Sequence, residues 1–379
     1  MSRITQIEVL YNHRQVGRLA LTKEGLCAFT YAAEWLDGGF SISPFELPLR
    51  NGIFMAKPRP FEGGFGVFDD SLPDGWGLLV LDRYLQKQGI NPLSLSLLDR
   101  LALVGSTGRG ALEFRPDQSV AAKQDYADFA KLALEAEQML DSEDYAGEGI
   151  EEFQHRGGSP GGARPKIFTR FEGREWLVKF RAKRDPLRIG REEYNYSVLA
   201  KQCGIEMPNT RLFEGQYFGV ERFDRTANGK LHVVSMAGLL GADYRLPSID
   251  YAHVFQVCAA LTHSAAEIWK VYRLMVFNFL IENKDDHAKN FAFIYRNDGW
   301  HFAPAYDLLP SDGINGYRTT SINDKIAPSA DDLIAVAVAA GLNKKEAINV
   351  LKTCGRPSTN EEAQGRSVHR RRVYQNEDD

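Results

Sequence analysis

The sequence predicts an α+β fold in which a β-rich N-terminal unit precedes a larger unit with its strands first and its helices second. Residues 3–33 alternate apolar and polar side chains, which is typical of short antiparallel strands with one buried face. Several strand-like runs follow within residues 166–240, whereas residues 250–282 show helical spacing. A chain of 379 residues is long enough for two or three domains.

Two helices are expected in the later part of the N-terminal unit. A turn at residues 72–77 precedes an amphipathic helix over 77–88, and a second helix is expected over 94–104. The glycine-rich residues 105–110, GSTGRG, come next. They lack the Lys-Ser/Thr of a P-loop and do not match GxGxxG, so we interpret them as a tight structural turn.

Residues 116–150 are polar and acidic and carry one amphipathic helix, YADFAKLALEAEQMLDSE, which would either link two domains or cap the following lobe. The next segment, QHRGGSPGGARPK, contains four glycines and two prolines, which favours a loop over a regular element. Backbone N–H groups of such a loop can surround a phosphate. Lys179, at the end of the second strand that follows, is the natural lysine to contact the same phosphates.

A polar loop and a hairpin follow the helical residues 250–282. Asn297, Asp298 and Gly299 separate two runs rich in aromatic and apolar residues, and Asn/Asp followed by Gly is a strong hairpin signal. Two more helices are expected over 330–342 and 344–355, and the polar tail 356–379 is expected to be disordered.

The loop before this hairpin carries the residue types that phosphoryl transfer needs. That reaction uses a carboxylate that accepts a hydroxyl proton and oxygen ligands that hold Mg²⁺ against nucleotide phosphates. Asp285 and Asn290 have the D-x-x-x-x-N spacing of a protein-kinase catalytic loop, and Asp307 follows the hairpin where another metal ligand is needed. Asp286 is one residue out of register, so we expect Asp285 to be the base. A solvated turn is the alternative interpretation of such a spacing alone.

Composition narrows the class of protein. The chain is 44% apolar and 25% charged, as in an ordinary globular protein, and its net charge of −4 gives no overall reason to expect nucleic-acid binding. The four cysteines have no metal-ligand spacing and are interpreted as reduced thiols. No run approaches 18 apolar residues, so we expect no membrane segment and a cytoplasmic protein.

Several motifs occur together in an order that resembles the HipA family of bacterial serine/threonine kinases, the toxins of type II toxin–antitoxin pairs. SLPDGWG and the VG…GAL pattern of residues 104–112 are similar to the family's N-terminal domain. GGSPGGARPK resembles its phosphate loop, ERFDR its strand motif, and DDHAKNF with AYDLLPS its catalytic core. The resemblance covers about residues 7–351. Three departures are Arg164, where the family often has Gln, Asp286, which replaces a smaller residue, and the segment after Gly355, which lacks the helical pattern expected there.

The resemblance implies a protein-kinase-like bilobal fold with an extra N-terminal β-rich subdomain, and ATP and Mg²⁺ as cofactors. The expected parts are the subdomain 1–115, the linker helix 116–150, the β-rich lobe 151–240, the helical lobe 241–355 and the tail 356–379. The implied site residues are the autophosphorylated Ser159, the phosphate-loop residues Gly161, Gly162, Ala163 and Lys166, the nucleotide lysine Lys179 with its partner Glu193, the adenine hinge Ser235, Met236 and Ala237, the base Asp285, the loop residues His287 and Lys289, and the Mg²⁺ ligands Asn290 and Asp307.

The resemblance also implies regulation and partners. A phosphate on Ser159 adds about −1.5 to −2 charges to a loop that must itself hold phosphates, so the loop would swing out and the kinase would switch off. The implied partners are a HipB-like helix-turn-helix antitoxin, operator DNA through that antitoxin, and an aminoacyl-tRNA synthetase as substrate. The alternatives are a catalytically silent, antitoxin-associated corepressor and a small-molecule phosphotransferase.

Overall fold

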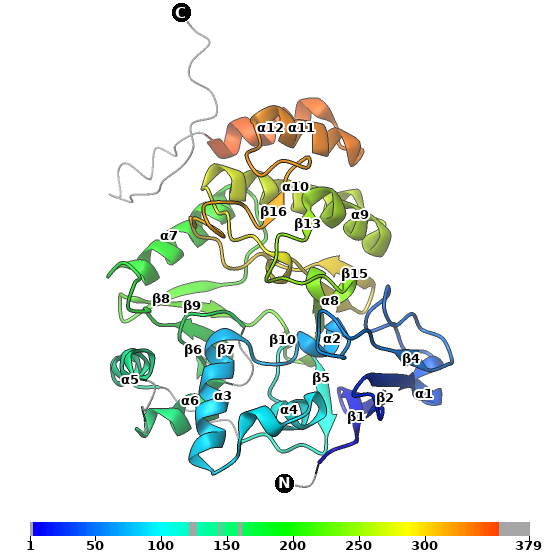
Figure 1. Cartoon of the computed structure of the whole chain (residues 1–379). Coiled ribbons are helices and arrows are strands. Elements are labelled where there is room, and N and C mark those ends of the chain that lie inside the picture. Colours follow the sequence, from blue (N-terminus) through cyan, green and yellow to red (C-terminus); the bar gives the residue numbers. More distant parts are fainter. Residues whose placement is uncertain (1–2, 121–126, 143–144, 146, 158–160, 356–379) are drawn as a thin grey trace, which may run out of the picture. The chain divides into compact units, whose positions relative to one another are not determined.

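The computed structural model describes residues 3–120, 127–142, 145, 147–157 and 161–355, and the chain divides into two compact units. The first unit comprises the described residues of Met1–Gly190, Arg211–Val234 and Gly238–Gly241. The second comprises those of Arg191–Thr210, Ser235–Ala237 and Ala242–Asp379. Most elements of both units are labelled in Figure 1.

The first unit combines strands and helices. Its strands, wholly or mainly, are β1 (Gln6–Tyr11), β2 (Arg14–Leu21), β3 (Cys27–Tyr31), β4 (Phe54–Met55), β5 (Leu112–Arg115), β6 (Lys166–Phe171), β7 (Arg174–Lys179), β8 (Thr210–Phe213), β9 (Tyr217–Glu221), β10 (Arg225–Thr226), β11 (Gly229–Lys230) and β12 (His232–Ser235). Its helices are α1 (Ala33–Leu36), α2 (Gly66–Asp69), α3 (Gly75–Lys87), the 3-10 helix η1 (Pro92–Ser94), α4 (Leu97–Val104), α5 (Phe129–Asp141) and α6 (Gly149–Gly157).

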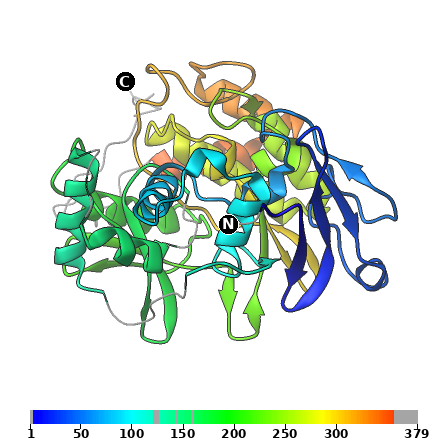
Figure 2. The ribbon, with the colours of Figure 1, turned by 60° about the horizontal axis from the view of Figure 1, so that its bottom comes forward.

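The N-terminal sheet has the strand order β4-β3-β2-β1-β5, and neighbouring strands run antiparallel. Leu19 on β2 pairs with Ile7 on β1 and with Phe29 on β3, and all three side chains are buried. The alternation of apolar and polar residues therefore places one face of each strand in the core. Figure 2 shows the dark-blue strands β1, β2 and β3 side by side. The short antiparallel strands predicted within residues 3–33 are confirmed.

Helices α3, α5 and α6 share one hydrophobic core with the second sheet, whose order is β6-β7-β9-β8. The ring of Trp76 on α3 lies 5.0 Å from that of Phe153 on α6, and the ring of Phe129 on α5 lies 5.4 Å from that of Phe213 on β8. The amphipathic helix expected within residues 116–150 is thus packed on the strands. Helix α6 was not predicted, because it ends in the segment that we interpreted as a glycine-rich loop; burial of Ile150 and Phe153 accounts for it.

The second unit is mainly helical. Its elements, wholly or mainly, are α7 (Ile189–Gln202), β13 (Ile249–Asp250), α9 (Tyr251–Thr262), α10 (Ala265–Leu280), the 3-10 helix η2 (Ala288–Asn290), β14 (Ala292–Arg296), β15 (Gly299–Phe302), β16 (Thr320–Ser321), α11 (Ala330–Ala339) and α12 (Lys344–Gly355). A short helix, α8 (Met236–Leu240), has residues in both units. Helix α10 contacts α9, α11 and α12, and these four helices are seen together in Figure 1.

Two element boundaries have causes that are visible in the sequence. Helix α4 begins at Leu97 rather than at residue 94, because Ser96 and Asp99 form a capping box: the Asp99 N–H donates to Ser96 Oγ at 3.2 Å, and the Ser96 N–H donates to Asp99 Oδ2 at 2.9 Å. The predicted hairpin is present as β14 and β15, but β15 ends at Phe302, two residues before Pro304, which cannot donate to a strand ladder.

None of the described helices is long and apolar enough to cross a membrane. All four cysteines are free and buried, and burial raises the pKa of the Cys27 thiol to about 11 and that of Cys258 to about 12. These two thiols are therefore protonated and unreactive at neutral pH.

The turn at residues 105–110 is held in place by the charged residues of ERFDR. Asp224 Oδ2 accepts a hydrogen bond from the Gly110 N–H at 2.8 Å. Arg222 and Arg225 donate to the Gly108 carbonyl at 3.1 and 2.9 Å, and both pair with the Asp224 carboxylate, at 2.8 and 2.9 Å. GSTGRG is therefore a structural turn, as the sequence predicts.

Substitution of Asp224 tests this arrangement. Burial alone would raise the pKa of Asp224, but Arg222 and Arg225 outweigh it and hold the pKa well below its ordinary value. We expect Asp224→Asn to lower the free energy of unfolding by about 3 kcal/mol at pH 7, because it removes the carboxylate nearest to the buried Arg222 and the largely buried Arg225. Urea unfolding measures this loss, and Asp37→Asn, which changes an exposed carboxylate of the same unit, is the matched control.

The pH dependence of that loss has a definite sign. A carboxylate with a depressed folded-state pKa contributes stability that is fully present above its unfolded pKa, about 3.9, and is lost as the pH falls through the folded pKa. The difference between the wild-type protein and Asp224→Asn should therefore be full at pH 7 and shrink below about pH 4. An equal difference at pH 7 and pH 3 would contradict the ion-pair role.

Candidate active site

The two residues with catalytic-loop spacing lie in one turn of the second unit, between α10 and β14. Asn290 Nδ2 donates to the main-chain carbonyl of Asp285 at 2.7 Å. The Asp285 N–H in turn donates to Asn283 Oδ1 at 3.2 Å. The five-residue spacing therefore brings Asp285 and Asn290 together through the backbone of the loop.

The two neighbouring aspartates of this loop have opposite environments. Asp285 is exposed, whereas Asp286 has only 1% of its surface accessible. Asp286 Oδ2 accepts a hydrogen bond from the Tyr251 hydroxyl at 2.8 Å and lies 3.3 Å from the guanidinium of Arg318. A carboxylate enclosed in this way cannot reach a substrate hydroxyl. The exposed position of Asp285 supports its assignment as the base.

Asp286 belongs to a buried polar network that fixes the loop backbone. Arg318 donates to the carbonyls of Asn283 and Asn278 at 2.9 and 3.1 Å. Asn278 Nδ2 donates to the Tyr251 hydroxyl at 3.0 Å, and Asn283 Nδ2 donates to Asn278 Oδ1 at 3.0 Å. Burial raises the pKa of Asp286, while Arg318 and the Tyr251 hydroxyl oppose that rise. The network connects the end of α10 to the catalytic-loop candidates.

A comparison of the two aspartates tests the role of this network. We expect Asp286→Asn to lower the free energy of unfolding by about 3 kcal/mol, because Arg318 would remain buried without a counter-charge. Asp285→Asn, one residue away but exposed, should change it by less than about 0.5 kcal/mol. Urea unfolding of both variants measures the contrast. Equal losses in the two variants would show that the buried pair does not hold the loop.

His287 and Lys289 contact residues of their own unit. His287 Nδ1 accepts a hydrogen bond from the Lys289 N–H at 3.2 Å and so caps the short helix η2. The side chain of Lys289 is buried, and its Nζ lies 4.0 Å from the centre of the Tyr244 ring. The sequence prediction had no means of finding Tyr244, which lies more than forty residues before Lys289 in the chain.

Hydrogen bonds join two predicted segments to the loop of Asp285 and its continuation. One segment carries Asp307, and the other is the predicted hinge. Tyr306, next to Asp307, donates its hydroxyl to the Lys289 carbonyl at 2.7 Å. Asp307 itself has a φ of +58°, in the left-handed region that non-glycine residues adopt only where the surrounding structure requires it. The Met236 N–H donates to the Phe291 carbonyl at 2.9 Å. These bonds place the three predicted segments of the second unit together.

The remaining predicted residues of the second unit are buried. Glu193 lies on α7, Ser235 is the last residue of β12, and Ala237 lies in the first turn of α8. Lys179 belongs to the first unit, whereas its predicted partner Glu193 belongs to the second.

The phosphate-loop candidates lie in the first unit. Lys166 opens β6 and pairs across the sheet with Lys179 at the end of β7. Gly162 has a φ of +92°; its N–H donates to a carboxylate oxygen of Asp74, and its carbonyl accepts from the Trp76 N–H at 3.0 Å. The SLPDGWG motif therefore contacts the glycine-rich loop directly.

Three further residues of the loop can be placed. Lys166 Nζ donates to the Gly161 carbonyl, and Ala163 follows Gly162 in the described part of the loop. Arg164 makes a two-point ion pair with Asp185, at 3.0 and 3.1 Å. Arg164, which stands where the family often has Gln, is thus paired with a residue of its own unit. Ser159 lies outside the described residues.

Comparison with known proteins identifies the family. The model for the HipA-like C-terminal domain matches residues 158–360, and the model for the HipA N-terminal domain matches residues 7–115. The chain belongs to the HipA family. The chain is 25% identical over 380 residues to Y4dM of Sinorhizobium fredii, a proposed kinase, covering 93% of this chain and 90% of that one. It is 23% identical over 342 residues to the serine/threonine-protein kinase toxin HipA of Shewanella oneidensis, covering 80% and 75%.

A solved structure supports the same fold. The HipA protein of Shewanella oneidensis, determined in a complex with HipB and its operator DNA, superimposes with a TM-score of 0.68 at 21% identity. The match covers 94% of this chain and 93% of the other. The predicted α+β fold of the HipA type is therefore confirmed.

Proposed function

We propose that this HipA-family protein is an ATP- and Mg²⁺-dependent serine/threonine protein kinase that acts as the toxin of a type II toxin–antitoxin pair. The observation that carries the proposal is the catalytic loop of the second unit. It presents an exposed Asp285, bonds Asn290 to the Asp285 backbone, and buries Asp286 against Arg318. A scaffold without catalytic activity has no evident use for this arrangement.

The residue types fit the cofactors that a kinase requires. Mg²⁺ is usually held by one or two carboxylates together with nucleotide phosphates, and Asn290 and Asp307 supply hard oxygen donors of this kind. Bound Mg²⁺ would neutralise charge that develops on the transferred phosphoryl group. Asp285 would accept the proton of the attacking hydroxyl.

The nucleotide would contact the residues that the family resemblance implies. Lys179 would bind its phosphates with Glu193 as partner, and residues 235–237 would bind adenine. The Gly162 N–H, which donates to Asp74, would be able to donate to a phosphate oxygen instead. Phosphorylation of Ser159 would place negative charge in the same loop and limit further activity.

Partners follow from the same family membership. We propose a HipB-like antitoxin and, through it, operator DNA, because the related Shewanella HipA was determined with both. An aminoacyl-tRNA synthetase is the proposed protein substrate, on the family resemblance of the sequence.

Intact mass measurement after incubation with Mg²⁺ and ATP tests the activity. We expect the wild-type protein to gain one phosphate, which peptide mapping should locate at Ser159. Asp285→Asn should slow this reaction by about a thousandfold, within the range for loss of a general base, and should keep its fold. The starting protein must first be shown to carry no phosphate.

Other outcomes would favour the alternatives. Thermal stabilisation by ATP without any phosphate on the protein would point to the silent corepressor. Phosphate transfer to an added small molecule instead of Ser159 would point to a small-molecule phosphotransferase. Undiminished autophosphorylation in Asp285→Asn would contradict the assignment of the base.

A further inference from the structure

Asp74, from the SLPDGWG motif, is bonded to the glycine-rich loop that precedes β6. It is the N-cap residue of α3, a position where an Asp side chain usually accepts a hydrogen bond from the first turn of its own helix. No such bond is made within the described residues 74–78. The Asp74 carboxylate accepts from the Gly162 N–H, 88 residues later in the chain. A carboxylate therefore takes up a backbone donor of the predicted phosphate loop.

Further hydrogen bonds fix the loop at this contact. The Gly162 carbonyl accepts from the Trp76 N–H at 3.0 Å, so both backbone groups of Gly162 are bonded to the start of α3. Lys166 Nζ donates to the Gly161 carbonyl, which belongs to the same peptide group as the Gly162 N–H. This peptide group is held at both ends, and its N–H is directed at Asp74.

Two glycines make the close approach possible. Gly75 has a φ of +46°, and a β carbon there would lie 2.6 Å from the Gly162 carbonyl oxygen. A β carbon on Gly161 would lie 3.2 Å from Asp74 Oδ1. A larger residue at either position would press the helix end and the loop apart, which is a use of glycine where two backbones meet closely.

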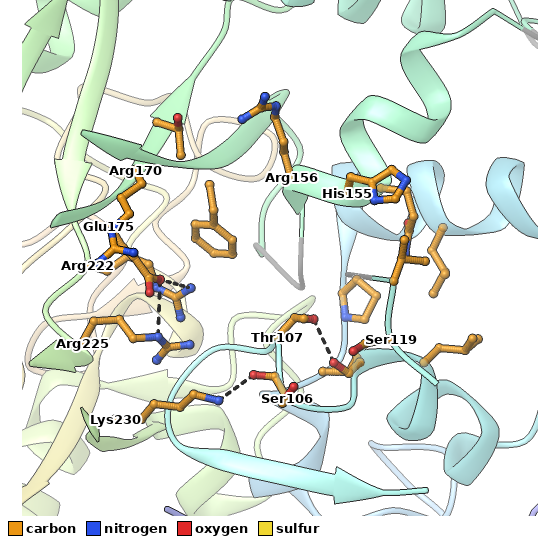
Figure 3. A pocket seen from close by; sticks show the side chains of 18 residues that line it. Ser106, Thr107, Ser119, His155, Arg156, Arg170, Glu175, Arg222, Arg225 and Lys230 are labelled. Carbon is orange, nitrogen blue, oxygen red and sulfur yellow. Dashed lines mark hydrogen bonds and ion pairs between the residues drawn. The ribbon is translucent and has the colours of Figure 1, made fainter. Parts of the chain in front are cut away.

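The elements on each side of the contact are packed in the core. Trp76, in the first turn of α3, is buried, and its ring lies 5.0 Å from that of Phe153 on α6. Figure 3 shows His155 and Arg156 on α6, before the loop, and Arg170 on β6, after it. Since α3, α6 and β6 share one hydrophobic core, the Asp74 side chain is presented to the loop from a fixed position.

A carboxylate at this amide opposes the binding of a phosphate. The Gly162 N–H can donate to a phosphate oxygen only when the Asp74 carboxylate leaves it, because both acceptors are anions that use the same donor. If both stayed, the two negative charges would repel each other at contact distance. Binding of a phosphate at this loop therefore includes the displacement of Asp74.

We propose that Asp74 is a built-in competitor of the nucleotide phosphates for the Gly162 N–H. Its carboxylate holds this donor, and a phosphate must displace it to bind there. The inference rests on the proposed ATP site and adds a regulation of that site: Asp74 lowers the affinity of the loop for phosphates. Its displacement also removes one of the two bonds between Gly162 and the start of α3, so phosphate binding and release of the loop are coupled.

Calorimetric binding of a non-hydrolysable ATP analogue with Mg²⁺ to the full chain, first shown to carry no phosphate, tests this proposal. Adenosine is the control ligand without phosphate. We expect Asp74→Asn to bind the analogue about tenfold more tightly than the wild-type protein, the usual effect of one hydrogen bond to a charged group. Asn matches Asp in size and in N-cap preference, so the helix should stay in place. Adenosine should bind both proteins equally.

A second variant and a matched control complete the test. Asp74→Ser also keeps a residue that suits an N-cap and removes the charge, so it should tighten binding of the analogue as well. Asp82→Asn removes the same charge from α3 about two turns further along, where Asp82 lies 3.4 Å from Arg100. This control should leave the binding of both ligands unchanged.

The possible outcomes separate this inference from the proposed function. Equal or weaker binding of the analogue by Asp74→Asn and Asp74→Ser would overturn the inference, and weaker binding would show that Asp74 prepares the loop for phosphates. Equal tightening of adenosine would also overturn it, because the effect would not depend on phosphate. Failure of the wild-type protein and both variants to bind the analogue would overturn the proposed nucleotide site, and this inference with it.

Discussion

The buried contact of Asp286 with Arg318 and Tyr251 is the constraint on which the proposed catalytic loop depends. A buried carboxylate is tolerated only when it is paired and hydrogen-bonded. Asp286 is held in this way, whereas the preceding residue, Asp285, is exposed. One residue of the pair therefore has a structural task, and the other is exposed.

The first unit uses the same physical device for a different purpose. Asp224 lies between Arg222 and Arg225, and the three residues hold a glycine-rich turn that is more than a hundred residues away in sequence. Their cost of burial is offset by mutual pairing and by hydrogen bonds to carbonyl groups.

Local signals in the sequence predicted much of this structure. The alternation in residues 3–33 predicted the first strands, and Asn297-Asp298-Gly299 predicted the hairpin, because both are decided by short-range geometry. Asp285 and Asn290 could be singled out because their spacing lies within one turn of chain.

Contacts between distant segments could not be predicted in this way. Nothing near Asp286 in sequence indicates that Arg318 would neutralise it, or that Asp74 would accept a hydrogen bond from Gly162. Helix α6 was missed because its stability comes from burial of Ile150 and Phe153 in a core that other elements supply.

A crystal structure with a non-hydrolysable ATP analogue and Mg²⁺ tests the kinase assignment most directly. We predict Mg²⁺ at about 2.1 Å from oxygens of Asn290 and Asp307, with Lys179 on the phosphates and Asp285 facing the terminal phosphate. Nucleotide bound away from these residues, or Asp286 in the place of Asp285, would contradict it.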